Sequence, residues 1–246
     1  MKTFDETDDP RRAWLLRALA GGLLGSAWFD MPLAADLLGQ RPAKLPPGQS
    51  IFRISGKVLV NGQAASADTR IAANDVVETA PGSEIIFVVG ANAMLVRGDS
   101  RVALKASGPT APVSGIEVLK GKALTVFGPG EPRRIVTSTA TIGIRGTGVY
   151  LDVDPQQTYF CTCYGAADVA ATKDPQSTDT VVSSHHDKPL YILADAPAGR
   201  SIRLAPFVNH TDQELQLIET LVGRTPPFIF PGSQYNTPRS NSTYRR

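Results

Sequence analysis

Short apolar runs separated by turn-forming residues fill the chain from about residue 51 to residue 137, and this texture limits the fold more than any other feature. In the first run Phe52, Ile54 and Val58 alternate with polar residues, and Asn61-Gly62 follows, a pair typical of two-residue hairpin turns. The further runs are 75–79, 84–89, 93–97, 101–104, 116–119, 123–127 and 135–137. Their spacing of roughly 8–12 residues predicts an all-β sandwich, roll or barrel.

The composition excludes several classes of protein. The 22 Gly and 19 Pro residues indicate many turns rather than long helices. The formal charge of +2 is too small for a nucleic-acid binder, and no basic stripe interrupted by aromatic residues is present. An apolar fraction of 42% with so low a net charge also excludes a wholly disordered chain. We therefore expect one large or two small folded domains and no nucleic-acid partner.

An export signal or N-terminal membrane anchor is predicted for residues 1–40. Arg11-Arg12 precedes a weakly apolar, uncharged run from Ala18 to Phe29, which is shorter than the span of about 20 residues that crosses a bilayer. Paired arginines before such a run resemble a twin-arginine signal. The predicted location is the periplasm, or the inner membrane facing the periplasm where the segment stays uncleaved. The competing interpretation is a buried amphipathic helix at the start of a cytosolic domain.

An Arg-Gly-Thr motif, Arg145-Gly146-Thr147 followed by Gly148, lies between two apolar runs. The glycines permit a sharp turn, and the Arg145 side chain can reach the carbonyl groups of a neighbouring turn. The simpler interpretation is that these residues only shape a β-corner. A phosphate cradle is not expected, because the glycines lead into a strand rather than into the N-terminus of a helix.

The segment 141–153 around this motif resembles the signature end of the FecR domain, named for the ferric dicitrate sensor-regulator family. The segments 75–83 and 116–127 are also similar to that family, so the resemblance covers about residues 48–155. It implies a periplasmic module for sensing or protein interaction, usually linked to signalling for iron uptake, with a protein partner at the cell envelope.

One difference from the family limits what the resemblance implies. Typical members begin with a cytoplasmic domain that handles a sigma factor, followed by a membrane span. Here only the polar residues 1–10 precede the apolar segment. We therefore expect the FecR-like domain without direct sigma-factor regulation, and membrane contact only through the N-terminal segment.

Both cysteines of the chain, Cys161 and Cys163, lie in a segment rich in aromatic residues and Thr, which is typical of a strand. Side chains alternate across a strand, so both thiols should share one face with Tyr159. Their Cα atoms should lie about 6.5–7 Å apart, near the limit for a disulfide. Three interpretations stay open: thiols without a ligand, a strained local disulfide, or half of a soft-metal site.

The three histidines could complete such a site, and the cofactor would then be a transition metal. His185 and His186 are predicted on a loop between two short strands, where solvated loop histidines are the simpler interpretation. His210 precedes a predicted helix and is either an ordinary packing residue or a ligand. A hydrolase triad of the His-Asp pair at 186–187 with a neighbouring serine is not expected, because no nucleophile elbow or oxyanion hole is present. The chain is therefore predicted not to be an enzyme.

The residues 209–224 form the clearest predicted helix. Thr211 and Glu214 form a Thr-x-x-Glu capping box, and the apolar residues after them fall on one helix face. Asp212 adds favourable charge near the N-terminus of this helix. The residues 231–246 are predicted to be a disordered tail.

The sequence thus predicts a mainly β fold, in which a sandwich- or roll-like FecR module at 48–155 is followed by a smaller β-rich region with one short amphipathic helix at 156–230. Two functions stay open. The first is an exported, non-enzymatic module for sensing or protein interaction. The alternative is a periplasmic metal- or cofactor-binding protein that uses the Cys-x-Cys pair and nearby histidines.

Overall fold

The computed structural model describes residues 43–108, 111–130 and 132–228, so the predicted leader and the predicted tail lie outside the described residues. The described chain is mainly β, which confirms the predicted fold class. Its strands are β1 (Ile51–Ser55), β2 (Val58–Val60), β3 (Gln63–Ala64), β4 (Val76–Thr79), β5 (Glu84–Val89), β6 (Asn92–Val96), β7 (Ser100–Lys105), β8 (Gly115–Val126), β9 (Arg133–Val136), β10 (Ala140–Val153), β11 (Gln157–Ala171), β12 (Thr178–Ser183), β13 (Leu190–Leu193) and β14 (Ile202–Leu204), and its helix is α2 (Asp212–Leu221). Within these residues no helix has the length and apolarity needed to cross a membrane.

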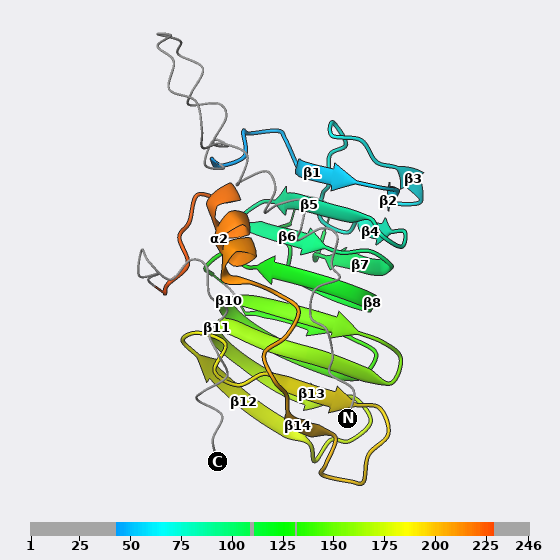
Figure 1. Cartoon of the computed structure of the whole chain (residues 1–246), viewed down its shortest axis with the longest axis vertical. Helices are drawn as coiled ribbons and strands as arrows, with labels where there is room; N and C mark the ends of the chain where they lie inside the picture. Colours follow the sequence, from blue (N-terminus) through cyan, green and yellow to red (C-terminus); the bar gives the residue numbers. More distant parts are fainter. Residues whose placement is uncertain (1–42, 109–110, 131, 229–246) are drawn as a thin grey trace, which may run out of the picture. The chain divides into compact units, whose positions relative to one another are not determined.

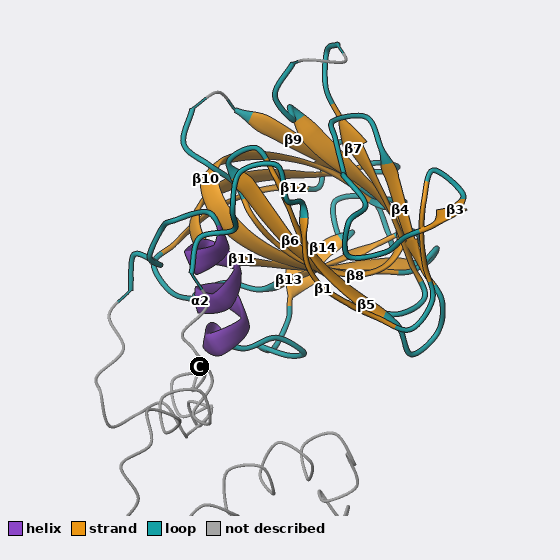
Figure 2. Cartoon of the chain, turned by 90° about the horizontal axis from the view of Figure 1, so that it is seen from above, coloured by secondary structure: helices purple, strands orange, loops and turns teal. Residues whose placement is uncertain are grey.

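The strands form one hydrogen-bonded network arranged in two layers (Figures 1 and 2). The first layer has the order β3, β2, β4, β7, first half of β8, β9, first half of β10, second half of β11, β12. The second has the order β1, β5, β6, second half of β8, second half of β10, first half of β11, β13, β14. All pairs are antiparallel except β8 with β9.

The three long strands pass from one layer to the other, and each contains a glycine with positive φ near the crossing point. These are Gly121 in β8, Gly146 in β10 and Gly165 in β11, with φ of 90°, 54° and 96°. A Cβ at Gly121 would collide with Ser100, and one at Gly165 would collide with Thr147. Glycine is therefore required at these two bends both by the backbone angle and by the close approach of a neighbouring strand.

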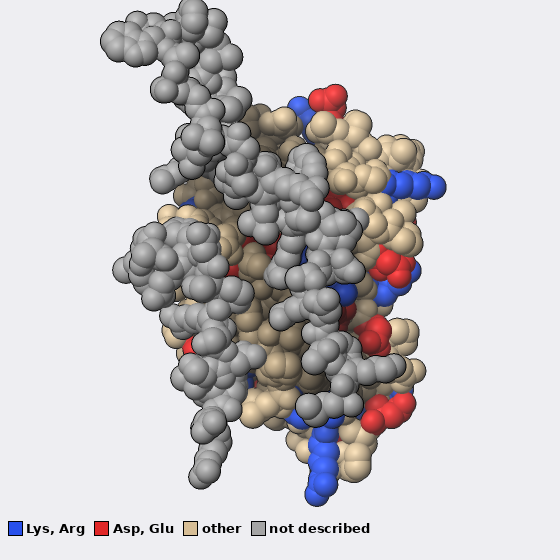
Figure 3. All heavy atoms as spheres, in the orientation of Figure 1, with Lys and Arg blue, Asp and Glu red and all other residues tan. Residues whose placement is uncertain are grey.

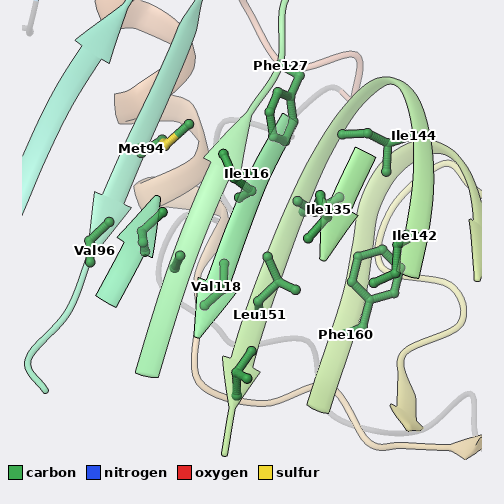
Figure 4. Close-up of a cluster of buried hydrophobic side chains, with 14 of the residues drawn as sticks. Met94, Val96, Ile116, Val118, Phe127, Ile135, Ile142, Ile144, Leu151 and Phe160 are labelled. Atoms are coloured by element: carbon green, nitrogen blue, oxygen red, sulfur yellow. The ribbon is translucent and has the colours of Figure 1, made fainter. Parts of the chain in front are cut away.

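The main hydrophobic core lies between the two layers. Along β10, Val149, Leu151 and Val153 point into it, whereas Tyr150 points to the opposite face, as the two-residue period of a strand requires. Figure 4 shows part of this core, with Phe160 of β11 among its apolar side chains.

A second apolar cluster lies on the outer face of the second layer, where α2 packs against β6 and β8 (Figure 1). Leu215, Ile218 and Leu221 form the buried stripe of this helix. The predicted capping box is present: Thr211 Oγ1 accepts from the Glu214 amide at 3.2 Å, and the Thr211 amide donates to Glu214 Oε2 at 2.9 Å. The outer cluster also contains both cysteines.

The predicted boundary between residues 155 and 156 falls in the turn that joins β10 to β11. These two strands pair along nearly their whole lengths, so residues 48–155 and the C-terminal region share one sheet. Charged side chains are of both signs on the face that Figure 3 shows, and ion pairs such as Arg101–Glu78 and Lys120–Asp99 join some of them.

Candidate metal centre

Cys161 and Cys163 lie on β11 and point to the outer face of the second layer together with Tyr159, the shared face that the alternation of strand side chains predicts. Both thiols are free, and both residues have an exposed fraction of 0%. The flat, extended strand thus holds two sulfur atoms side by side beneath the segments that cover this face.

Two histidines reach the thiols from different segments. His186 lies on the loop between β12 and β13, where it has a φ of 55° and its amide donates to the Cys163 carbonyl at 3.0 Å. His210 lies directly before the N-cap of α2, after Asn209, which also has a positive φ of 66°. Two left-handed backbone positions therefore direct the chain so that both rings face β11.

The four side chains converge on one point. Cys161 Sγ lies 3.4 Å from His186 Nδ1, Cys163 Sγ lies 3.5 Å from His210 Nε2, and the two ring nitrogens are 3.2 Å apart. All four ligand atoms lie within 4.8 Å of one another. A tetrahedral zinc ion with two sulfur and two nitrogen ligands separates S from N by about 3.5 Å and N from N by about 3.3 Å, given the usual bond lengths. The two S–N contacts and the N–N contact match these values.

The hydrogen bonds of the two rings leave the converging nitrogens free to act as ligands. His186 Nε2 donates to Asp212 Oδ1 at 2.9 Å, and His210 Nδ1 donates to the Val208 carbonyl at 2.8 Å. The opposite nitrogens, His186 Nδ1 and His210 Nε2, are those that face the thiols. Carboxylate and carbonyl acceptors of this kind orient histidine ligands in metalloproteins and raise their basicity.

Aromatic side chains and one arginine hold His210 in place. The Tyr150 ring stacks on the imidazole with centroids 4.4 Å apart, and Phe207 packs against both His210 and His186. Arg97 donates to the Asn209 carbonyl, pairs with Glu214 at 2.6 Å and lies over the Tyr150 ring. The segment before α2 is thereby tied to the end of β6.

The electrostatics of the metal-free cluster favour an ionised thiol, Cys161, beside a protonated imidazole, His186. Burial opposes ionisation of Cys161, but hydrogen bonds with Cys163, His186 and His210 outweigh it and hold its pKa well below the usual value. Burial and the neighbouring Cys161 raise the pKa of Cys163. Burial lowers the pKa of His186, but its hydrogen bonds with Asp212 and Cys161 prevail and raise it to about 9. A metal ion held by these four residues would displace both the proton between Cys161 and His186 and the proton on Cys163, and both would pass to solvent.

His185 lies outside the group of four. Its Nε2 contacts both carboxylate oxygens of Asp212, at 2.9 and 3.0 Å, so one carboxylate accepts from two adjacent histidines. Burial opposes ionisation of Asp212, but these two imidazoles outweigh it and keep its pKa below the usual value. From the sequence, Asp212 is expected only to add a favourable charge near the N-terminus of the helix. No motif in the sequence shows that it also orients a histidine.

The remaining candidate residues take other positions. Arg145 is exposed, with Nη2 3.6 Å from Asp168 Oδ2, and Gly146 to Gly148 span the irregular register between β10 and β11. Asp187 accepts from the Ser184 amide, the Ser184 hydroxyl and the His185 amide, which makes it a turn-stabilising residue.

No family model matches the chain, and no curated protein matches it. Two crystal structures, described as a putative anti-sigma factor from Parabacteroides distasonis at 2.50 and 1.65 Å resolution, are similar to part of it. Each is 10% identical with a TM-score of 0.41, and the match covers 53% of this chain and 57% of the other. The chain thus spans little more than half the length of these proteins.

Proposed function

We propose that the protein binds one transition-metal ion, with zinc as the best-suited ion, through Cys161, Cys163, His186 and His210. The observation that carries the proposal is the convergence of two sulfur and two nitrogen atoms at the spacing of a tetrahedral site. Two thiolates with two imidazoles form a ligand set that zinc prefers in proteins, and harder cations such as magnesium or calcium prefer oxygen.

The site suits a structural ion rather than a catalytic one. All four residues are buried, and the four protein ligands fill a tetrahedron, so no coordination position is left for water or substrate. Cys161, His186 and Asp212 stand in the order of a nucleophile, base and orienting acid, but a nucleophile with an exposed fraction of 0% has no access to a substrate. We therefore propose a non-enzymatic protein.

A second candidate function is the exported module for sensing or protein interaction that the FecR resemblance implies. It is supported by the location of the three FecR-like segments, 75–83, 116–127 and 141–153, on β4, β8 and β10 and the residues beside them, within one continuous sheet. In this proposal the protein acts in the periplasm or on the inner membrane, and it recognises a protein partner. Capture of a partner from membranes, with mass spectrometry of the mature N-terminus, tests both location and partner.

Elemental analysis of the full chain, purified without chelator, tests the metal proposal. We expect about one zinc ion per chain and two thiols that are protected from a thiol reagent until a chelator is added. A chain that remains metal free after incubation with equimolar zinc, with both thiols still reduced, would overturn the proposal. Recovery of a different transition metal at the same stoichiometry would retain the site and correct the ion.

The variant Asp212→Asn is expected to bind zinc about 10- to 100-fold more weakly than the wild type, because the His186 ring loses its charged acceptor. Asparagine keeps the size of the side chain and is compatible with the start of a helix. The affinity is measured by competition with a chromophoric chelator. The matched control is Asp99→Asn, which removes an ion pair with Lys120 away from the ligand loop, and an equal loss in both variants would contradict the assigned role.

A further inference from the structure

The geometry points to a second, outer position for the metal ion, formed by His185 and Asp212. We infer that a divalent transition-metal ion enters and leaves the buried site through these two side chains. This inference rests on the proposed metal-binding function and concerns the route of the ion, not its final ligands.

The ligands of the inner site are buried. Cys161 and Cys163 have an exposed fraction of 0%, and the side chain of His186 has one of 7%. An ion therefore cannot pass directly from water to the four inner ligands. The side chains of His185 and Asp212 are 17% and 25% exposed, and they lie directly beside the inner site. Among the described residues they form, together with His186, the second group of potential ligands.

The ligand atoms of the outer position adjoin those of the inner site. His185 Nε2 and His186 Nε2 each lie 2.9 Å from Asp212 Oδ1, and one ligand atom from each of these three residues lies within 4.8 Å of the others. The other nitrogen of the His186 ring faces Cys161 at 3.4 Å. The outer carboxylate thus contacts the back of an inner ligand, and the outer and inner positions lie on opposite sides of the same imidazole ring.

Ligand exchange favours movement of an ion from the outer position to the inner one. An imidazole and a carboxylate bind a borderline divalent cation, but less tightly than two thiolates and two imidazoles do. An ion at the outer position takes the lone pair of His185 Nε2, whose proton moves to Nδ1 or to water. It then exchanges these ligands for the inner set, and the protons held by the inner thiols and imidazoles pass to solvent. No electron is transferred.

A purely orienting role for His185 predicts a different result. A residue that only positions Asp212 affects the equilibrium, because it stabilises the bound state and leaves the rate of uptake unchanged. A residue on the entry route changes the rates of uptake and release by the same factor and leaves their ratio, the dissociation constant, unchanged. The two roles are therefore separable by measuring rates and affinity on the same variant.

The test uses the full chain with His185→Gln, since glutamine still donates to Asp212 but is a poor ligand for zinc. Zinc uptake by the metal-free protein and zinc release to a chromophoric chelator are followed by rapid mixing. We expect both rates to fall about tenfold, equal to about 1.4 kcal/mol of activation free energy, with an unchanged dissociation constant. The matched control is Lys188→Gln on the same loop, for which no rate should change.

Three outcomes would overturn the inference. Unchanged rates in His185→Gln would exclude an entry role, and a weakened affinity with unchanged uptake would assign His185 to positioning alone. Equal slowing in Lys188→Gln would point to an effect on the whole loop. Failure of the wild-type protein to bind zinc at all would instead overturn the proposed function, and the inference with it.

Discussion

If the protein binds zinc as proposed, removal of the ion is expected to lower the melting temperature by about 10 °C. An ion that binds only the folded state adds about 4 kcal/mol to the free energy of unfolding when its free concentration is 1,000 times the dissociation constant. For a domain of this size each kcal/mol corresponds to roughly 2–4 °C. The measurement is a thermal melt of one preparation before and after chelation, with the metal content determined in parallel.

The loss of stability should begin where the ligands join separate segments. His186 lies on the loop between β12 and β13 and His210 before α2, so loss of the ion releases both segments from β11. Amide hydrogen exchange should accelerate in residues 184–189 and 205–222 and remain slow in β8 and β10. An unchanged melting temperature in a preparation shown to be free of metal would contradict this prediction.

Replacement of both cysteines, Cys161→Ser with Cys163→Ser, is expected to weaken zinc binding by about 1,000-fold or more. The reason is that a serine hydroxyl is not ionised at neutral pH and is a far poorer zinc ligand than a thiolate. Two of the four ligands are then lost. Competition with a chromophoric chelator measures the affinity, and elemental analysis measures the metal content after purification.

The double variant has two controls. Thr162→Ser changes the residue between the cysteines, which lies on the core face of the same strand, and should keep one zinc ion per chain. The melting temperature of the double variant should resemble that of the metal-free wild type and should not respond to a chelator. Stoichiometric zinc in the double variant would show that the ion binds elsewhere in the chain.

The strands were the most predictable part of the fold, because their residues follow the alternation and turn rules closely. The predicted run 84–89 has the same bounds as β5. The runs 116–119 and 123–127, in contrast, belong to one long strand, β8, because Gly121 bends the ladder without ending it. A glycine with positive φ is typical of both turns and bends, and only its neighbours on other strands decide between them.

The candidate site was predictable in its residue types and not in its assembly. The two-residue period of a strand places both thiols on one face, and the capping box places His210 at the start of a helix. The meeting of these elements depends on long-range packing, since His210 is separated by 47 residues from Cys163 and His186 by 25 from Cys161. The role of Asp212 depends on the same packing, which no local pattern encodes.

The docking of α2 on β6 and β8 has a consequence for the order of folding. Synthesis proceeds from the N-terminus, so β6 and β8 emerge well before the helix that covers their outer face. Until residue 221 is available, Leu95, Leu124 and Val126 have no cover on that face. A nascent chain in which α2 has not yet docked therefore exposes this apolar surface, which is the kind of surface that promotes aggregation during folding.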